Sequence, residues 1–200
     1  MSKTGKIALK SLVAAASLSI GLALVPASAE DILVRNSDNA EAEVSALMQS
    51  IMPFVNGEAQ TTTNIAQIGE NNTANSSVKG SSSLSLIQQS GSNNRAVQAI
   101  EGANSALLLV QGGTNNNVLQ ASKGNRNFQM VGVSGNDNNV AYLQAGNDLA
   151  GALDVRDSQN SNVLAIQTPQ SGRYLMPTGL RGLQNTTVVI VPGRMYVIPK

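Results

Sequence analysis

Three aspartates near the end of a repetitive region are the residues whose spacing most resembles acid–base machinery. Asp148, Asp154 and Asp157 lie close together in the chain, and paired carboxylates can act as general acid and general base. The chain has no His and no Cys, so it lacks an imidazole base and a thiol nucleophile. The spacing implies neither a base partner nor a pocket, and solvated turn charges that oppose edge growth are the favoured interpretation. We therefore expect a protein that is not an enzyme.

Composition also excludes several classes of binding site. A formal net charge of +1 argues against nucleic-acid binding, which needs Lys and Arg clustered on one face. Gly112-Gly113 is not a phosphate loop, because no GxxxxGK pattern follows it. Asp137 and Asp148 occupy equal turn positions half a repeat apart, on opposite edges, which argues against a shared calcium site. We expect no metal, no cofactor and no small-molecule substrate.

The chemistry that the sequence does repeat is that of the side-chain amide. Asn and Gln donate and accept hydrogen bonds at once, so identical residues at identical positions can form ladders along a stack. Such ladders would pair the buried polar groups of a core that is poor in large apolar side chains. The residues expected to form these ladders and to carry self-assembly are Gln67, Asn72, Ser83, Gln89, Asn94, Ser105, Gln111, Asn116, Asn138 and Gln144.

A repeat of eleven residues positions these side chains. Glycine recurs in a column with this period, and Asp157 continues the column with a turn-compatible residue. Asn or Ser recurs three residues after each glycine as far as Asn138, and the column continues with Leu149 and Asn160. Glutamine and aliphatic residues alternate before successive glycines, so the full unit is 22 residues made of two halves. The turn glycines of this pattern are Gly69, Gly80, Gly91, Gly102, Gly113, Gly124, Gly135 and Gly146.

Each half of the unit predicts one strand followed by a tight turn. Alternate residues that lead into each glycine share one side, beginning polar and continuing with small or aliphatic side chains. Gly, Asn, Ser and Asp dominate between the halves, as a tight turn requires. In the last half we expect the inward positions at Asn160, Asn162, Leu164 and Ile166. The fold class is therefore all-β, a β-solenoid of about five 22-residue strand-turn-strand rungs over residues 61–166.

The first 29 residues are typical of a secretory signal peptide. Three lysines precede an apolar run from Leu12 to Val25, and a small-x-small pattern ends at Ala29. Cleavage is expected between Ala29 and Glu30. The alternative is a membrane anchor, but the run is shorter than the roughly 20 residues that a spanning helix needs. The protein is thus expected to be secreted.

Charge divides the remaining chain into three segments. Residues 30–60 carry six acidic residues and one arginine, a net charge of −5, whereas residues 167–200 carry four basic residues and no acidic one, a net charge of +4. In the acidic segment, Asn39 could cap a short helix as far as about Phe54, and this segment is either an export signal or a cap. In the basic tail, two β-prone runs flank Pro192-Gly193, which predicts a C-terminal hairpin. The hairpin either covers the last rung or docks a partner.

The phased positions resemble the curlin repeat of bacterial curli fibres, Ser-x5-Gln-x-Gly-x2-Asn-x-Ala-x3-Gln. The second rung carries Ser83, Gln89, Gly91, Asn94 and Ala96 at these positions. The pattern is incomplete, because Ile100 replaces the last glutamine of this second rung and Val133 replaces a glutamine of the fourth. The long basic and apolar tail is a second departure. Both departures favour a minor, nucleating or surface-attached subunit, or a divergent curlin.

The resemblance implies a subunit of an extracellular amyloid fibre at the bacterial cell surface, active in adhesion and biofilm matrix. Its implied partners are further copies of itself, other curlin subunits, and the curli secretion pore with its accessory proteins. One alternative is a soluble monomeric solenoid that binds a surface, such as an adhesin or an ice-binding protein. Thr61, Thr62 and Thr63 lie along one strand and not down a column, which weakens the ice-binding version. Another alternative, a β-helix enzyme acting on polysaccharide, would need stacked carboxylates, which the sequence lacks.

Overall fold

The computed structural model describes residues 32–35, 61–171, 174–175 and 179–200. These residues form strands, joined by turns and one short 3-10 helix, η1 (Pro169–Ser171). One sheet, sheet A, contains β1 (Ile32–Arg35), β2 (Thr62–Glu70), β4 (Leu84–Ser92), β6 (Ala106–Thr114), β8 (Phe128–Asn136), β10 (Ala150–Gln159), β12 (Tyr174–Leu175) and β13 (Leu180–Arg181). The other, sheet B, contains β3 (Thr73–Lys79), β5 (Arg95–Glu101), β7 (Asn117–Lys123), β9 (Asn139–Ala145), β11 (Asn162–Gln167), β14 (Thr186–Val191) and β15 (Arg194–Pro199).

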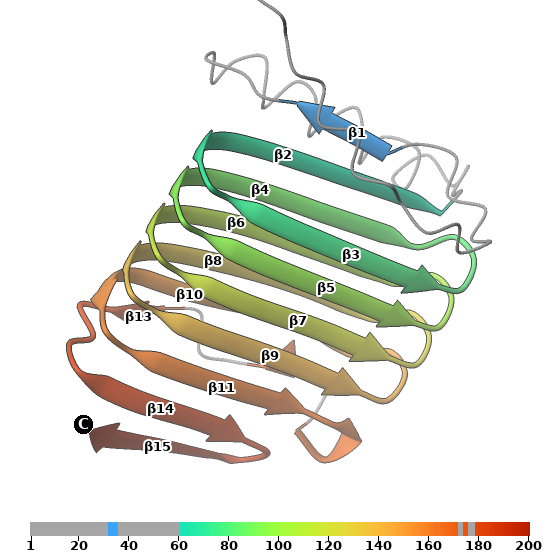
Figure 1. Cartoon of the computed structure of the whole chain (residues 1–200). Coiled ribbons are helices and arrows are strands. Elements are labelled where there is room, and N and C mark those ends of the chain that lie inside the picture. Colours follow the sequence, from blue (N-terminus) through green and yellow to red (C-terminus); the bar gives the residue numbers. More distant parts are fainter. Residues whose placement is uncertain (1–31, 36–60, 172–173, 176–178) are drawn as a thin grey trace, which may run out of the picture.

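The chain winds between the two sheets one strand at a time, which makes a β-solenoid (Figure 1). Each even-numbered strand from β2 to β10 pairs in parallel with the next strand of sheet A, and the odd-numbered strands from β3 to β11 do the same in sheet B. Through the first four rungs the paired residues are 22 apart, as in Ile87 with Leu109 and Ala96 with Val118. The prediction of an all-β solenoid is confirmed.

The two sheets enclose a narrow interior that mixes aliphatic and amide side chains. Ile87, Leu109, Val131 and Leu153 form one interior column of sheet A and are almost completely buried. The column beside it in sheet A holds Gln89 and Gln111, which are equally buried. The parallel register stacks Gln89 on Gln111, so these buried amides can pair with each other.

The last strand of the repeat corrects one prediction from the sequence. A bulge between Val155 and Ser158 adds one residue to β10, so Gly135 pairs with Ser158 and not with Asp157. The residues from Ser158 to Gln167 are shifted by one position. The inward residues are therefore Ser161, directly before β11, and Val163, Ala165 and Gln167 within it. The expected inward set, Asn160, Asn162, Leu164 and Ile166, is exposed or only half-buried.

The tail continues the stack beyond the five repeat rungs. In sheet A, β12 and β13 both pair in parallel with β10, and in sheet B, β14 pairs in parallel with β11. The final strand β15 then pairs antiparallel with β14, which confirms the C-terminal hairpin. The hairpin covers β11, so the solenoid has a sixth turn. Its last strand runs against the direction of its neighbours (Figure 1).

Three expectations concern residues that the structure does not describe. The leader over residues 1–29, the cleavage point between Ala29 and Glu30, and the helix from Asn39 to about Phe54 all lie outside the described ranges. Among the described residues, none forms a helix long and apolar enough to cross a membrane.

Candidate assembly ladders

A ladder of glutamine amides runs through the interior beside sheet A. Gln67 Nε2 donates to Gln89 Oε1 over 2.6 Å, and Gln89 Nε2 donates to Gln111 Oε1 over 2.9 Å. Gln111 Nε2 then donates to the carbonyl oxygen of Asn116 over 2.7 Å. The next residue of the column is Val133, which ends the ladder. Three consecutive rungs are thus linked by amides that all donate in the same direction.

A second amide pair lies beside sheet B. Gln98 Nε2 donates to Gln120 Oε1 over 2.7 Å, and Ser85 Oγ donates to Gln98 Oε1 from the facing sheet. Both glutamines also donate to carbonyl oxygens of the facing sheet, at Leu86 and Leu108. The ladder residues expected from the sequence do not include Gln98 and Gln120. Their spacing of 22 residues, equal to the repeat, is the signal that identifies them.

An asparagine ladder occupies one edge of the solenoid, where each strand of sheet A turns into sheet B. The Oδ1 atom of Asn94 accepts from the backbone N–H of Asn116, over 3.1 Å, and its Nδ2 donates to the carbonyl oxygen of Gly113, over 2.9 Å. Asn72, Asn116 and Asn138 repeat both contacts with the rung that follows each of them. Because of the bulge, the backbone N–H that Asn138 receives is that of Ser161.

A shorter ladder occupies the opposite edge. Ser83 Oγ accepts from the N–H of Ser105, and Ser105 Oγ accepts from the N–H of Asn127, both over 3.2 Å. Asn127 Oδ1 accepts in turn from the N–H of Leu149 over 3.0 Å. The ladder ends at Leu149, because its side chain is apolar. Both edge ladders point from each rung towards the next one in the sequence.

Gln144, the last member of the expected ladder set, lies near a buried tyrosine. Gln144 Nε2 donates to Gln167 Oε1 over 2.8 Å, and the hydroxyl of Tyr142 donates to the same oxygen over 2.7 Å. Burial raises the pKa of the Tyr142 phenol well above its usual value, and a hydrogen bond with Gln144 opposes the shift. Gly151 makes room for this ring, because a Cβ at that position would overlap the tyrosine hydroxyl. Gln167 was missed from the sequence because of the bulge.

Glycine at the turns lets successive rungs approach closely. The turn glycines of the repeat all have positive φ, and at Gly113 φ is +97°. A Cβ at Gly113 would overlap the carbonyl oxygen of Gly135, the same oxygen that Asn116 Nδ2 reaches. The glycine column and the asparagine ladder are therefore parts of one arrangement.

The three aspartates with suitable spacing for acid–base chemistry do not converge. Asp148 pairs with Arg126 at 2.6 Å, Asp154 with Arg156 at 2.6 Å, and Asp157 with Arg181 at 3.5 Å. Hydrogen bonding to the carboxylate, more than charge alone, raises the pKa of the Arg126 and Arg156 guanidinium groups. Within the described ranges, no group of three metal-ligating side chains gathers at one point.

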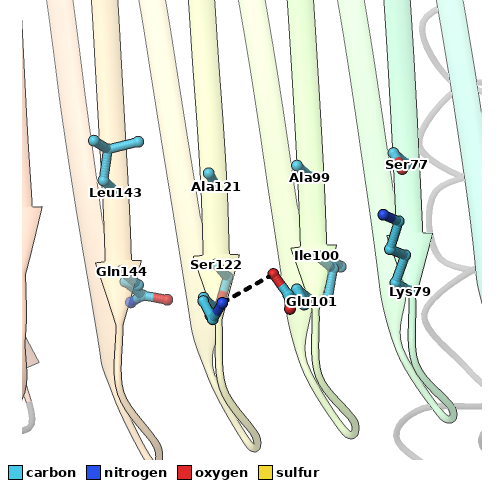
Figure 2. A pocket seen from close by; sticks show the side chains of 10 residues that line it. Ser77, Lys79, Ala99, Ile100, Glu101, Ala121, Ser122, Leu143 and Gln144 are labelled. Atoms are coloured by element: carbon cyan, nitrogen blue, oxygen red, sulfur yellow. Dashed lines mark ion pairs between the residues drawn. The ribbon is translucent and has the colours of Figure 1, made fainter.

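The outer faces differ in chemistry. Figure 2 shows a depression on the outside of sheet B, where the small side chains of Ser77, Ala99 and Ala121 lie beside charged ones. Lys123 pairs with Glu101 at 3.4 Å, so the charges there alternate in sign and offer no pocket for a single ion. The outside of sheet A is more apolar, with exposed fractions of 40–53% at Phe128, Met130 and Val110.

The interior remains partly open at the first rung. Ile65, Gln67 and Val78 are only half-buried, whereas Ile87, Gln89 and Ile100, one rung later, are buried. In both edge ladders a side-chain oxygen of one rung accepts from a backbone N–H of the following rung. The first rung of the repeat has no earlier repeat rung to supply such an oxygen to its own backbone N–H groups.

Comparison with known proteins adds no relative to this description. No family model matches the chain, and no curated protein or solved structure is similar enough to count as a match.

Proposed function

We propose that this chain is the structural subunit of a secreted, curli-type fibre that grows by stacking rungs end to end. The observation that supports the proposal is the run of hydrogen-bonded amides from half-buried Gln67 through buried Gln89 to buried Gln111, which crosses three rungs without a break. Hydrogen-bonded amide columns of this type stabilise cross-β fibres. The half-buried first rung is the place where such a column could continue into another copy.

The proposal includes location and partners. The subunit acts outside the cell, at the bacterial surface, in adhesion and biofilm matrix. It assembles with further copies of itself and with other curlin subunits after export through a dedicated pore. The aliphatic breaks at Val133 and Val155 favour a minor or nucleating role within such a fibre, since they shorten the amide column.

The test is polymerisation of the purified chain diluted from denaturant, followed by thioflavin fluorescence and electron microscopy. Fibres that seed fresh monomer support the proposal, and a missing lag phase supports the nucleating role. The variant Gln89→Ala with Asn94→Ala removes one rung of two ladders, and we expect its rate to fall at least tenfold. The matched control replaces two exposed, outward-facing asparagines, Asn75→Ala with Asn117→Ala, and should polymerise at the normal rate.

A second candidate function rests on the apolar exterior of sheet A. Val110 on β6 and Phe128 and Met130 on the adjacent strand β8 lie on the outer face of sheet A, and an exposed apolar patch is the kind of surface that a monomeric adhesin would use. A chain that stays monomeric and β-rich for days would favour this function over the fibre.

A further inference from the structure

The two sheets contain the same number of levels but do not start at the same level. Sheet A begins one level earlier than sheet B, because β1 pairs with β2 and no described strand of sheet B lies beside β3 on that side. Sheet B ends one level later, because β15 follows β14 while the described strands of sheet A end with β12 and β13. Counted over the described strands, each sheet has seven levels when β12 and β13 share one. The two ends are therefore steps of opposite shape (Figure 1).

The step at the C-terminal end carries apolar side chains without a cover. Met195 pairs with Ile190 and Val197 pairs with Val188, and both partners are buried interior residues. Directly opposed residues of a sheet share a face, so Met195 and Val197 stand at interior positions. Their exposed fractions are nevertheless 51% and 56%. Sheet A has no described strand at their level that could face them.

The step at the N-terminal end is the matching half. Ile32 is in register with Thr63, and Val34 is in register with Ile65. Thr63 is buried and Ile65 packs against the core, so the backbone of β1 places two apolar residues at interior register positions. The described part of sheet B has no strand at the level of β1.

We propose that β15 of one copy and β1 of the next copy form one shared rung, so that each junction completes a core layer. This inference rests on the proposed end-to-end assembly and specifies its joint. Interior columns of the two sheets face each other as Ser85 faces Gln98. In these columns Met195 lies opposite the position of Ile32, and Val197 opposite the position of Val34. In the same joint, β15 pairs antiparallel with β3 of the next copy.

The free edge of β15 is suited to such pairing. The N–H of Lys200 donates to the carbonyl oxygen of Asn185 on the β14 side. Backbone groups alternate in direction along a strand, so those of Met195, Val197 and Pro199 face away from β14. Proline is tolerated there because its missing N–H belongs to the free side. The edge thus keeps the donors of Met195 and Val197 for an added strand.

Charge favours joining unlike ends. The segment that contains β1, residues 30–60, has a net charge of −5, and the tail over residues 167–200 has a net charge of +4. Pairing β15 with β15 of a second copy would instead bring Arg194 and Lys200 of both copies together. A second copy joined head to tail is therefore the occupant that the chain specifies.

The decisive experiment is disulfide cross-linking between introduced cysteines. The chain has no native cysteine that could form other disulfides. If the columns continue across the joint, Val197 lies opposite Ala74 of the next copy, since both belong to the column of Val188. The double variant Ala74→Cys with Val197→Cys, oxidised during assembly, should give a ladder of covalent multimers on a non-reducing gel. The two positions lie at opposite ends of one copy, so they cannot bridge within a chain. The pair Asn117→Cys with Val197→Cys is the control and should give none.

Each outcome decides a separate point. Fibres with covalent multimers of the Ala74→Cys, Val197→Cys chain support the shared rung. Fibres without them, or dimers from Val197→Cys alone, overturn the shared rung while the proposed fibre function stands. Absence of both fibres and multimers overturns both.

Two measurements avoid reliance on cysteine. Fibre diffraction of the unmodified chain should show an axial repeat of seven levels, about 34 Å at roughly 4.8 Å per strand, and a repeat of six levels would overturn the joint. Val197→Asp should slow elongation at least tenfold, whereas Ile198→Asp, on the outward side of the same strand, should slow it less than threefold. Equal effects of the two variants would also contradict the joint.

Discussion

At the scale of single residues, Tyr142 shows how an aromatic polar group is accommodated among stacked amides. Its ring fills space left by Gly151, and its hydroxyl donates to Gln167 over 2.7 Å. Burial favours the neutral phenol over the phenolate, so the raised pKa of Tyr142 is a property of the folded chain only. The free energy of unfolding should therefore depend on pH in the alkaline range through Tyr142.

We predict that the free energy of unfolding falls as the pH rises above about 10, the ordinary pKa of tyrosine. In that range the unfolded chain loses the Tyr142 proton while the folded chain keeps it, so the contribution is complete below pH 10 and is lost above it. The slope for one such group is about 1.4 kcal/mol per pH unit. Urea unfolding at several pH values measures it. Tyr142→Phe should be less stable at pH 8 but lack this part of the slope; an identical slope in the variant would refute the linkage.

At the scale of elements, the turns determine how closely two rungs can approach. Gly113 and Gly182 both have positive φ, but only Gly113 lies against a carbonyl oxygen of the next rung. That oxygen is also held by Asn116 Nδ2, so it cannot move aside without breaking a ladder contact. Substitution of Gly182 therefore tests backbone strain alone, whereas substitution of Gly113 tests backbone strain together with the close approach of two rungs.

Gly113→Ala should cost about 3–5 kcal/mol of unfolding free energy, because φ strain and a backbone overlap add. Gly182→Ala meets nothing within 4 Å and should cost only about 1–2 kcal/mol of φ strain. Chemical denaturation of both variants provides the comparison. Equal losses would show that contact between turns contributes little.

The sequence predicts the strands as far as the repeat stays regular, and fails where one residue is inserted. The glycine column gives the rungs, the direction of the chain and the interior face through Gln144. The bulge in β10 leaves the spacing of turn-compatible residues almost unchanged, since Asp157 and Asn160 both adopt positive φ. Only the buried pattern of β11, with Val163, Ala165 and Gln167 inside, reveals the shift. Periodicity alone cannot distinguish these registers, because alternation survives a slip of one residue.

At the scale of the whole molecule, stability should vary along the axis. Each rung contacts its neighbours only, so the solenoid behaves as a one-dimensional stack whose ends open before its middle. The partial exposure of Ile65 and Val78 at one end and of Met195 and Val197 at the other agrees with this view. Backbone amides of β6 and β7 in the middle have paired strands on both sides.

Hydrogen exchange should therefore be slowest in β6 and β7 and fastest in β3 and β15 when the chain is monomeric. Assembly through a shared rung changes only the ends, because it gives β3 and β15 a second neighbour and leaves the middle as it was. We expect exchange in β3 and β15 to slow at least tenfold in fibres, while β6 and β7 change little. The terminal strand β15 then serves as the probe and β7 as the internal control. Fibres in which β15 exchanges as fast as in the monomer would mean that the hairpin lies outside the stack, and that copies meet through another surface.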